Sequence, residues 1–191
     1  MKIRLLEGYG ERDVDLAVGP KPHYPEAKIL VTLVKLLRPH IVVEVGVLVA
    51  DTTVAMAWHL PEGGKVYGVD VDIERPRQLI DAWGLWDRIE LLGGLSHVVI
   101  PTLPDAIDLV YIDGDHDKET VKRDTELIWP KVRSGGIVVW HDINDRGPGE
   151  YVPFAFPQGI YIPFGQGLMM AQKPPEAFFY LDGTRIPWPS L

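Results

Sequence analysis

The chain has 191 residues, of which 46% are hydrophobic and 24% charged, and its net charge at pH 7 is −8. This length suits one domain that buries about 70% of the surface exposed by the unfolded chain. With no cysteine, disulfides and thiolate metal sites are excluded. The acidic balance argues against nucleic-acid binding. Neither a membrane span nor a signal peptide is found, so we expect a cytoplasmic protein that does not bind membranes.

Helices and strands are expected to alternate between residues 25 and 142. Residues 1–24 show no sustained period and are expected to form an irregular lead-in. The predicted helices cover residues 25–38, 52–60, 74–86 and 118–129, and the predicted strands cover 41–45, 65–71, 88–92, 106–113 and 135–142. This alternation is typical of a parallel α/β sheet.

The last forty residues are rich in proline. Within them, residues 159–164 and 167–172 are predicted to form an antiparallel hairpin at the sheet edge. Residues 174–191 are too rich in aromatic residues for a solvated tail. We expect this tail to pack on its own domain or on a second subunit of a homo-oligomer. The whole chain, residues 1–191, is therefore predicted to form a single domain.

Polar residues gather where the predicted strands end. In open α/β sheets, ligands bind at the carboxyl ends of the strands. Four of the five strands end in such groups: Glu44 and Gly46 after the first, Asp70 and Asp72 after the second, Asp113, Asp115 and His116 after the fourth, and His141 and Asp142 after the fifth. A purely structural distribution would scatter these groups, so a site at this edge of the sheet is predicted.

The turn after the first strand, EVGVLVADTT, lacks the dinucleotide fingerprint G-x-G-x-x-G. Its acidic Glu44 and the helix start at Thr52 suit a ligand with a cationic end, a carboxylate and a ribose. Asp70 could accept hydrogen bonds from both ribose hydroxyls. The alternatives are a plain buried turn with Glu44 in a structural salt bridge, and a helix-capping aspartate, which suits Asp72 better than Asp70.

Two carboxylates and an imidazole are expected to meet at the ends of neighbouring strands. Asp113, His141 and Asp142 suit Mg²⁺ or Mn²⁺, and the imidazole shifts the preference toward Mn²⁺, Fe²⁺ or Zn²⁺. Alternatively, His141 and Asp142 cap the strand and hydrogen-bond one another. His116 is a candidate general base for deprotonating a hydroxyl, and the alternative is a helix-terminal histidine without a catalytic role.

Two stretches resemble a known family. VVEVGVLVADTTVAMA resembles the first motif of class I S-adenosylmethionine-dependent methyltransferases, in their catechol O-methyltransferase-like branch. IDLVYIDGDHDKETVKRDTELIWPKVRSGGIVVWHD resembles a bacterial methyltransferase family related to cephalosporin-hydroxylase-like and macrolide-sugar O-methyltransferase proteins. The resemblance covers about residues 25–142. It implies a Rossmann-like, doubly wound α/β fold whose seven-stranded, mostly parallel sheet ends in an antiparallel C-terminal strand.

The resemblance also implies roles for individual residues. The residues expected to bind S-adenosyl-L-methionine are Glu44, Gly46, Val47, Thr52, Asp70, Val71, Ser96 and Asp113. Asp113, His141 and Asp142 match the metal positions, and His116 matches the base of the sugar O-methyltransferases, so Asp113 and His116 are the expected catalytic residues. Three positions depart from the family: Ala50 replaces a glycine, Leu95 a carboxylate and His141 an acidic residue.

The predicted function is therefore O-methylation of a small-molecule hydroxyl by S-adenosyl-L-methionine, assisted by Mg²⁺ or Mn²⁺. One alternative is a metal-dependent hydroxylase-like enzyme. Another is a binding or assembly protein that keeps the fold without catalysis, which the departures at Ala50 and Leu95 motivate. Acceptor specificity is expected in the lead-in and in a loop at residues 143–151.

Overall fold

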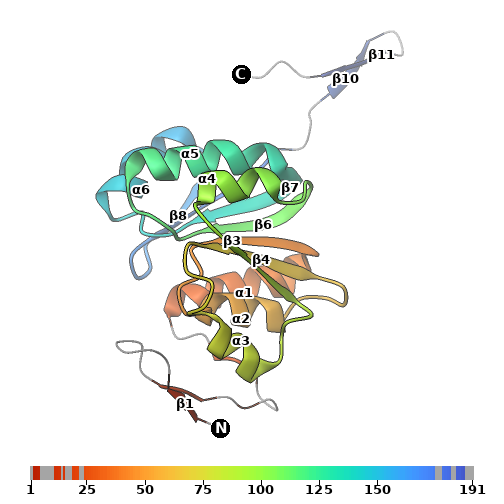
Figure 1. Ribbon diagram of the computed structural model, residues 1–191. Coiled ribbons are helices and arrows are strands. Elements are labelled where there is room, and N and C mark those ends of the chain that lie inside the picture. Colours follow the sequence, from red (N-terminus) through yellow and green to blue (C-terminus); the bar gives the residue numbers. More distant parts are fainter. Residues whose placement is uncertain are drawn as a thin grey trace.

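The computed structural model describes residues 2–4, 11–13, 15, 19–21, 24–174, 178–181 and 184–187. Its centre is a seven-stranded sheet in the order β5-β4-β3-β6-β7-β9-β8 (Figure 1). The strands are β3 (Ile41–Val45), β4 (Lys65–Asp70), β5 (Ile89–Gly93), β6 (Ile107–Ile112), β7 (Val132–Trp140), β8 (Ile160–Ile162) and β9 (Leu168–Gln172). The first five run parallel, and β9 runs antiparallel to both its neighbours. The predicted fold class is confirmed.

Helices cover both faces of this sheet (Figure 1). One layer holds α1 (Pro25–Leu37), α2 (Asp51–Trp58) and α3 (Arg77–Trp83), and the other holds α4 (Ser96–Val99), α5 (Lys118–Ile128) and α6 (Arg146–Ala155). Two short 3₁₀ turns, η1 (Ile100–Thr102) and η2 (Trp129–Lys131), follow α4 and α5. Each layer buries its own apolar cluster against the sheet, as expected for a doubly wound fold.

Strand β3 illustrates why the sequences of the central strands consist mostly of consecutive apolar residues. Successive side chains point to opposite faces of a sheet. Val42 belongs to the apolar cluster shared with α1 and α2, whereas Val43 and Val45 belong to the cluster shared with α5. Glu44 shares the face of Val42 and therefore points toward α2, where it is almost completely buried.

The structure corrects the prediction for residues 143–151, which were expected to form a loop. Residues 146–155 instead form α6, although Pro153 lies inside that helix. Gly147 allows the close packing, because a Cβ there would lie under 3.0 Å from the main chain at His116. The segment after β7 is therefore built against the loop that carries His116.

The ends of the chain differ in part from the prediction. In the lead-in, β1 (Lys2–Arg4) and β2 (Glu11–Asp13) form an antiparallel pair. The predicted late hairpin is confirmed as β8 and β9. After it, β10 (Phe178–Leu181) and β11 (Thr184–Pro187) form a separate two-stranded sheet. For residues 175–191 the structure describes the backbone of these two strands and no side chains, so the expected packing of the aromatic tail stays a prediction. In the described part of the chain, no helix has the length and apolarity that a membrane span requires.

Candidate functional site

A cavity of about 880 Å³ opens at the carboxyl ends of the parallel strands. All of the predicted site residues line it: Glu44, Gly46, Val47, Thr52, Asp70, Val71, Ser96, Asp113, His116, His141 and Asp142. The topology explains why, because the carboxyl ends of β3, β4, β6 and β7 meet at one edge of the sheet. The structure thus brings these residues together, and their individual roles remain predictions.

The loop after β3 has an unusual backbone. Gly46 has a φ of +91°, and a Cβ added there would lie under 3.0 Å from the main chain of Asp113 and Gly114. Leu48 and Ala50 also have positive φ values, of 53° and 66°. The left-handed conformation costs a residue with a Cβ of the order of 1 kcal/mol, so the backbone is strained at Ala50.

Asp70 holds this loop in place. Its Oδ2 accepts hydrogen bonds from the backbone N–H groups of Val47, at 2.8 Å, and Leu48, at 2.9 Å. Its Oδ1 accepts the N–H of Asp72 at 3.0 Å. Oδ2 therefore has two donors already, and a ribose hydroxyl would find its open acceptor position on Oδ1. Sequence reasoning missed this bracing role, because it depends on contacts 22 and 23 residues away.

Glu44 forms part of the cavity wall as a buried carboxyl group. Its Oε2 accepts a short hydrogen bond from the Thr53 hydroxyl of α2. Burial raises the pKa of Glu44 well above its usual value, and the charges of Asp113 and Asp70 raise it further. Glu44 thus pairs with the hydroxyl group of Thr53. Among the described residues, no basic side chain forms the salt bridge that was the alternative.

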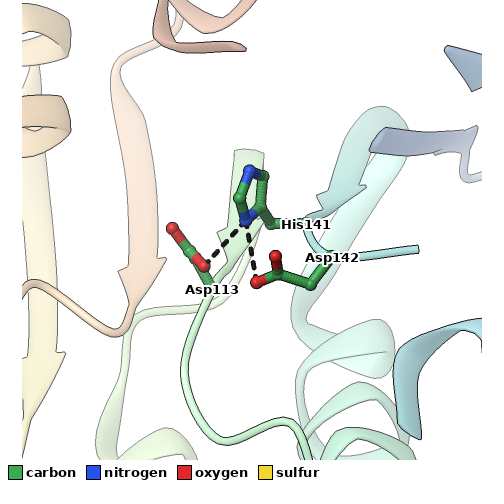
Figure 2. A group of neighbouring side chains, drawn as sticks. All are labelled: Asp113, His141 and Asp142. Carbon is green, nitrogen blue, oxygen red and sulfur yellow. Dashed lines mark hydrogen bonds and ion pairs between the residues drawn. The ribbon is translucent and has the colours of Figure 1, made fainter. Parts of the chain in front are cut away.

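Asp113, His141 and Asp142 form a compact group, drawn in Figure 2. The Nδ1 atom of His141 lies 3.1 Å from Asp113 Oδ1 and 2.9 Å from Asp142 Oδ2. One ligand atom from each residue lies within 4.8 Å of the others. Asp142 adopts a φ of 55°, and such strain is concentrated at functional sites. The three side chains could hold a divalent metal ion with two oxygens and one nitrogen.

The two aspartates control the charge of His141 in the metal-free protein. Burial alone would lower the pKa of His141, but hydrogen bonds to Asp113 and Asp142, together with their charges, raise it to about 10. Burial alone would raise the pKa of Asp142. The hydrogen bond to His141 and the charge of His141 outweigh burial, so the pKa of Asp142 is lowered. The group therefore carries an imidazolium between two carboxylates at neutral pH.

This ion pairing predicts a loss of stability at high pH. Since the pKa of His141 is about 10 in the folded chain and about 6.5 when unfolded, its contribution is complete below pH 6.5 and disappears as the pH rises toward 10. We expect the free energy of unfolding, measured in urea with EDTA present, to fall by about 2 kcal/mol over this pH range after allowing for solvent screening. His141→Gln should flatten this pH dependence. His59→Gln, which alters a helix-end histidine bonded to Ala55 O, should preserve it, and equal profiles for both variants would contradict the assignment.

His116 shares a carboxylate with His141. Its Nε2 lies 2.9 Å from Asp142 Oδ2, and its Nδ1 lies 3.5 Å from Asp145 Oδ2. About half of its side chain is exposed, and it lines the cavity beside the Asp113 group. Asp142 therefore connects the candidate base to the candidate metal ligands. Asp145 was missed by the sequence analysis because it was placed in a loop rather than at the start of α6.

Further residues of the site have no signal in the sequence. The buried Tyr111 hydroxyl donates to Asp113 Oδ2 at 2.9 Å. Burial, followed by the charge of Asp113, raises the pKa of Tyr111 well above its usual value, so the phenol remains a donor. The Ser96 hydroxyl donates to the buried Asp124 Oδ1 at 2.7 Å. In the same part of the cavity, the buried Nδ1 of His97 has no hydrogen-bond partner among the described residues.

Sequence comparison gives a family match that covers the parallel part of the sheet and the predicted site residues. The family model described as "Methyltransferase domain" matches residues 43–143. Catechol O-methyltransferase of Mus musculus is 29% identical over 139 residues, covering 68% of this chain and 52% of the relative. Catechol O-methyltransferase of Sus scrofa is 28% identical over 111 residues, covering 54% of this chain and 59% of the relative. The chain thus spans about half the length of these curated relatives.

Solved structures share the fold. A methyltransferase from Geobacter sulfurreducens has a TM-score of 0.69 at 18% identity, covering 81% of each chain. An O-methyltransferase from Bacillus cereus, solved in complex with SAH, has a TM-score of 0.67 at 18% identity, covering 85% of this chain and 83% of that one. With the family match over residues 43–143, the resemblance drawn from the two sequence motifs is confirmed: the chain belongs to the methyltransferase-domain family.

Proposed function

We propose that the protein transfers a methyl group from S-adenosyl-L-methionine to a hydroxyl of a small molecule, with a divalent metal ion orienting the acceptor. One observation supports the proposal above all. The loop after β3, held by Asp70, lines the same cavity as the group of Asp113, His141 and Asp142 and as His116. The match to two catechol O-methyltransferases and the bound SAH of the Bacillus cereus protein support it.

The cofactor is proposed to lie across the ends of β3 and β4. Asp70 shapes the loop through Val47 and Leu48, and its Oδ1 would accept a hydrogen bond from the ribose. Thr52 stands in the first turn of α2, whose N-terminal dipole favours the carboxylate of the methionine part. The acidic groups around the cavity favour the positively charged sulfonium. Bound there, the cofactor supplies an activated methyl group.

The donor set at the ends of β6 and β7 fits a metal ion. Asp113, His141 and Asp142 place ligand atoms within 4.8 Å of one another, and carboxylates with imidazole suit Mg²⁺ or Mn²⁺. When bound, the ion would supply a positive charge that lowers the pKa of an acceptor hydroxyl. Tyr111 keeps Asp113 in position through its hydroxyl group.

The protein's own groups would then orient the acceptor and receive its proton. His116 lies at the cavity wall, where its imidazole would accept the proton of the acceptor hydroxyl as the methyl group is transferred from sulfur to that oxygen. Asp142 orients the ring through Nε2. Transfer of this kind depends mainly on positioning the two reactants in line.

Calorimetry with S-adenosylhomocysteine tests the cofactor part of the proposal. We expect saturable binding to the full chain, weakened when Asp70→Ala removes the acceptor that holds the loop. Asp105→Ala is the control, since Asp105 is exposed and pairs with Lys131 away from the cavity. An absence of binding at millimolar ligand would contradict the proposal and favour a fold kept without catalysis.

His116→Ala tests the base. We expect the kcat for a methyl acceptor to fall by about 10²–10⁴-fold, because general acid–base catalysis contributes that much. The affinity for S-adenosylhomocysteine should stay the same. His59→Ala changes a histidine that bonds to Ala55 O in α2 and should retain full turnover. If kcat barely changes in the His116 variant, another group accepts the proton.

A further inference from the structure

A buried carboxylate from α1 faces His141 from the side opposite the two aspartates. Glu26 stands in the first turn of α1, outside the residues that match the family model, and its side chain is 7% exposed. Its Oε1 lies 3.8 Å from His141 Nε2, whereas Asp113 and Asp142 contact Nδ1. The imidazole therefore stands between Glu26 and the group proposed to hold the metal.

The loop between β8 and β9 holds the Glu26 carboxylate in this place. Oε1 of Glu26 accepts the backbone N–H of Gln166 at 3.0 Å, joining parts of the chain that are 140 residues apart. Gly165 has a φ of +58°, and a Cβ there would lie under 3.0 Å from the carboxyl group. Only a glycine lets the loop approach so closely. The position of Glu26 thus depends on both α1 and the hairpin.

We infer that Glu26 is a positioning residue for the metal site. With a metal ion at Nδ1 of His141, the proton that remains on Nε2 would face Glu26, which would keep the ring directed at the space between Asp113 and Asp142. At 3.8 Å the contact is electrostatic rather than a hydrogen bond. Histidine ligands of metals are commonly oriented by a carboxylate beyond the ring, which also raises their basicity. The inference rests on the metal-assisted form of the proposed function.

The residue type at position 141 makes this role specific. His141 contributes the imidazole of the donor set, whereas Asp113 and Asp142 contribute carboxylates. A carboxylate ligand has no second nitrogen and no N–H group to face Glu26, so it gains nothing from a carboxylate behind it. The effect of Glu26 on metal binding should therefore depend on the presence of His141.

A double-mutant cycle tests this dependence. Calorimetry would measure Mn²⁺ affinity of the metal-free full chain for the wild type, Glu26→Gln, His141→Asp and the double variant. Glutamine keeps the size of Glu26 and an acceptor for Gln166, and removes only the charge. We expect Glu26→Gln to weaken Mn²⁺ binding about 10–100-fold when residue 141 is histidine. In the His141→Asp background the same substitution should weaken it less than about 3-fold. Glu62→Gln, at an exposed turn, is the control for net charge.

The outcomes separate the inference from the function on which it rests. Unchanged Mn²⁺ affinity in Glu26→Gln overturns the inference alone. Equal losses in both backgrounds overturn it too, because Glu26 would then act through its charge only. A wild-type chain that binds no Mn²⁺ at millimolar concentration overturns the metal site itself. If melting with EDTA shows that Glu26→Gln does not fold, Glu26→Asp takes its place in the cycle, because the shorter side chain withdraws the carboxylate from Nε2 of His141. A loss of Mn²⁺ affinity that depends on His141 supports the inference, and an unchanged affinity overturns it.

Discussion

Gly46→Ala is expected to destabilise the protein by about 3 kcal/mol and to abolish tight binding of S-adenosylhomocysteine. Gly46 has a φ of +91°, which costs alanine about 1 kcal/mol. In addition, the new Cβ would lie under 3.0 Å from the main chain of Asp113 and Gly114. Because both neighbours are backbone, the clash must move the end of β6, and overpacking of this kind costs about 1–3 kcal/mol.

Gly63→Ala separates the cost of alanine at a positive φ from the cost of the steric clash. Gly63 also has a positive φ, of +75°, but a Cβ there would meet nothing within 4 Å. In Gly63→Ala the free energy of unfolding, measured in urea, should fall by about 1 kcal/mol, and the affinity for S-adenosylhomocysteine should not change. The difference between the two variants gives the cost of the clash with Asp113. Equal losses would mean that the main chain at residue 113 adjusts freely.

Asp142→Asn is expected to have the largest effect on activity, with Mn²⁺ affinity about 100-fold lower and turnover about 10²–10⁴-fold lower. One oxygen of Asp142 lies 2.9 Å from both His141 Nδ1 and His116 Nε2. Removing its charge therefore affects the metal ligands and the base together. Asparagine has the same shape and tolerates the φ of 55° at this position, so the fold should remain intact.

Asp145→Asn is the matched control for Asp142→Asn. The Asp145 carboxylate lies 3.5 Å from His116 Nδ1 and does not belong to the group of Asp113, His141 and Asp142. We expect unchanged Mn²⁺ affinity and less than about a tenfold loss of turnover, measured beside melting curves of both variants. If the two substitutions lower turnover equally, the contact of Asp142 with His141 contributes nothing, and the proposed division between metal ligand and base is wrong.

The sequence predicted the sheet and the edge of the sheet where the cavity lies. Both predictions depend on local signals: the apolar run of β3, buried on both faces, and the polar residues that follow each strand. The parallel order of the strands then brings those residues together. This reasoning placed Asp113, His141 and Asp142 in one group from positions 28 and 29 residues apart in the chain.

Other parts of the site depend on contacts that no local pattern indicates. Glu26 looks like an ordinary first-turn carboxylate of an amphipathic helix, and only the return of the β8–β9 loop reveals its contact with His141. Asp124 looks like one more charge of α5, yet it is buried against Ser96. The helix α6 was missed because Pro148 and Pro153 weaken its helical pattern.

The contact between Glu26 and Gln166 also affects how the protein matures on the ribosome. Its two residues are 140 positions apart, so at about 5–20 residues per second the carboxylate waits about 7–28 s for its partner to be synthesised. Over that interval the parallel strands β3 to β7 emerge, but the wall beside His141 cannot yet exist. The cavity wall beside His141 is thus completed together with β8 and β9, after the five parallel strands.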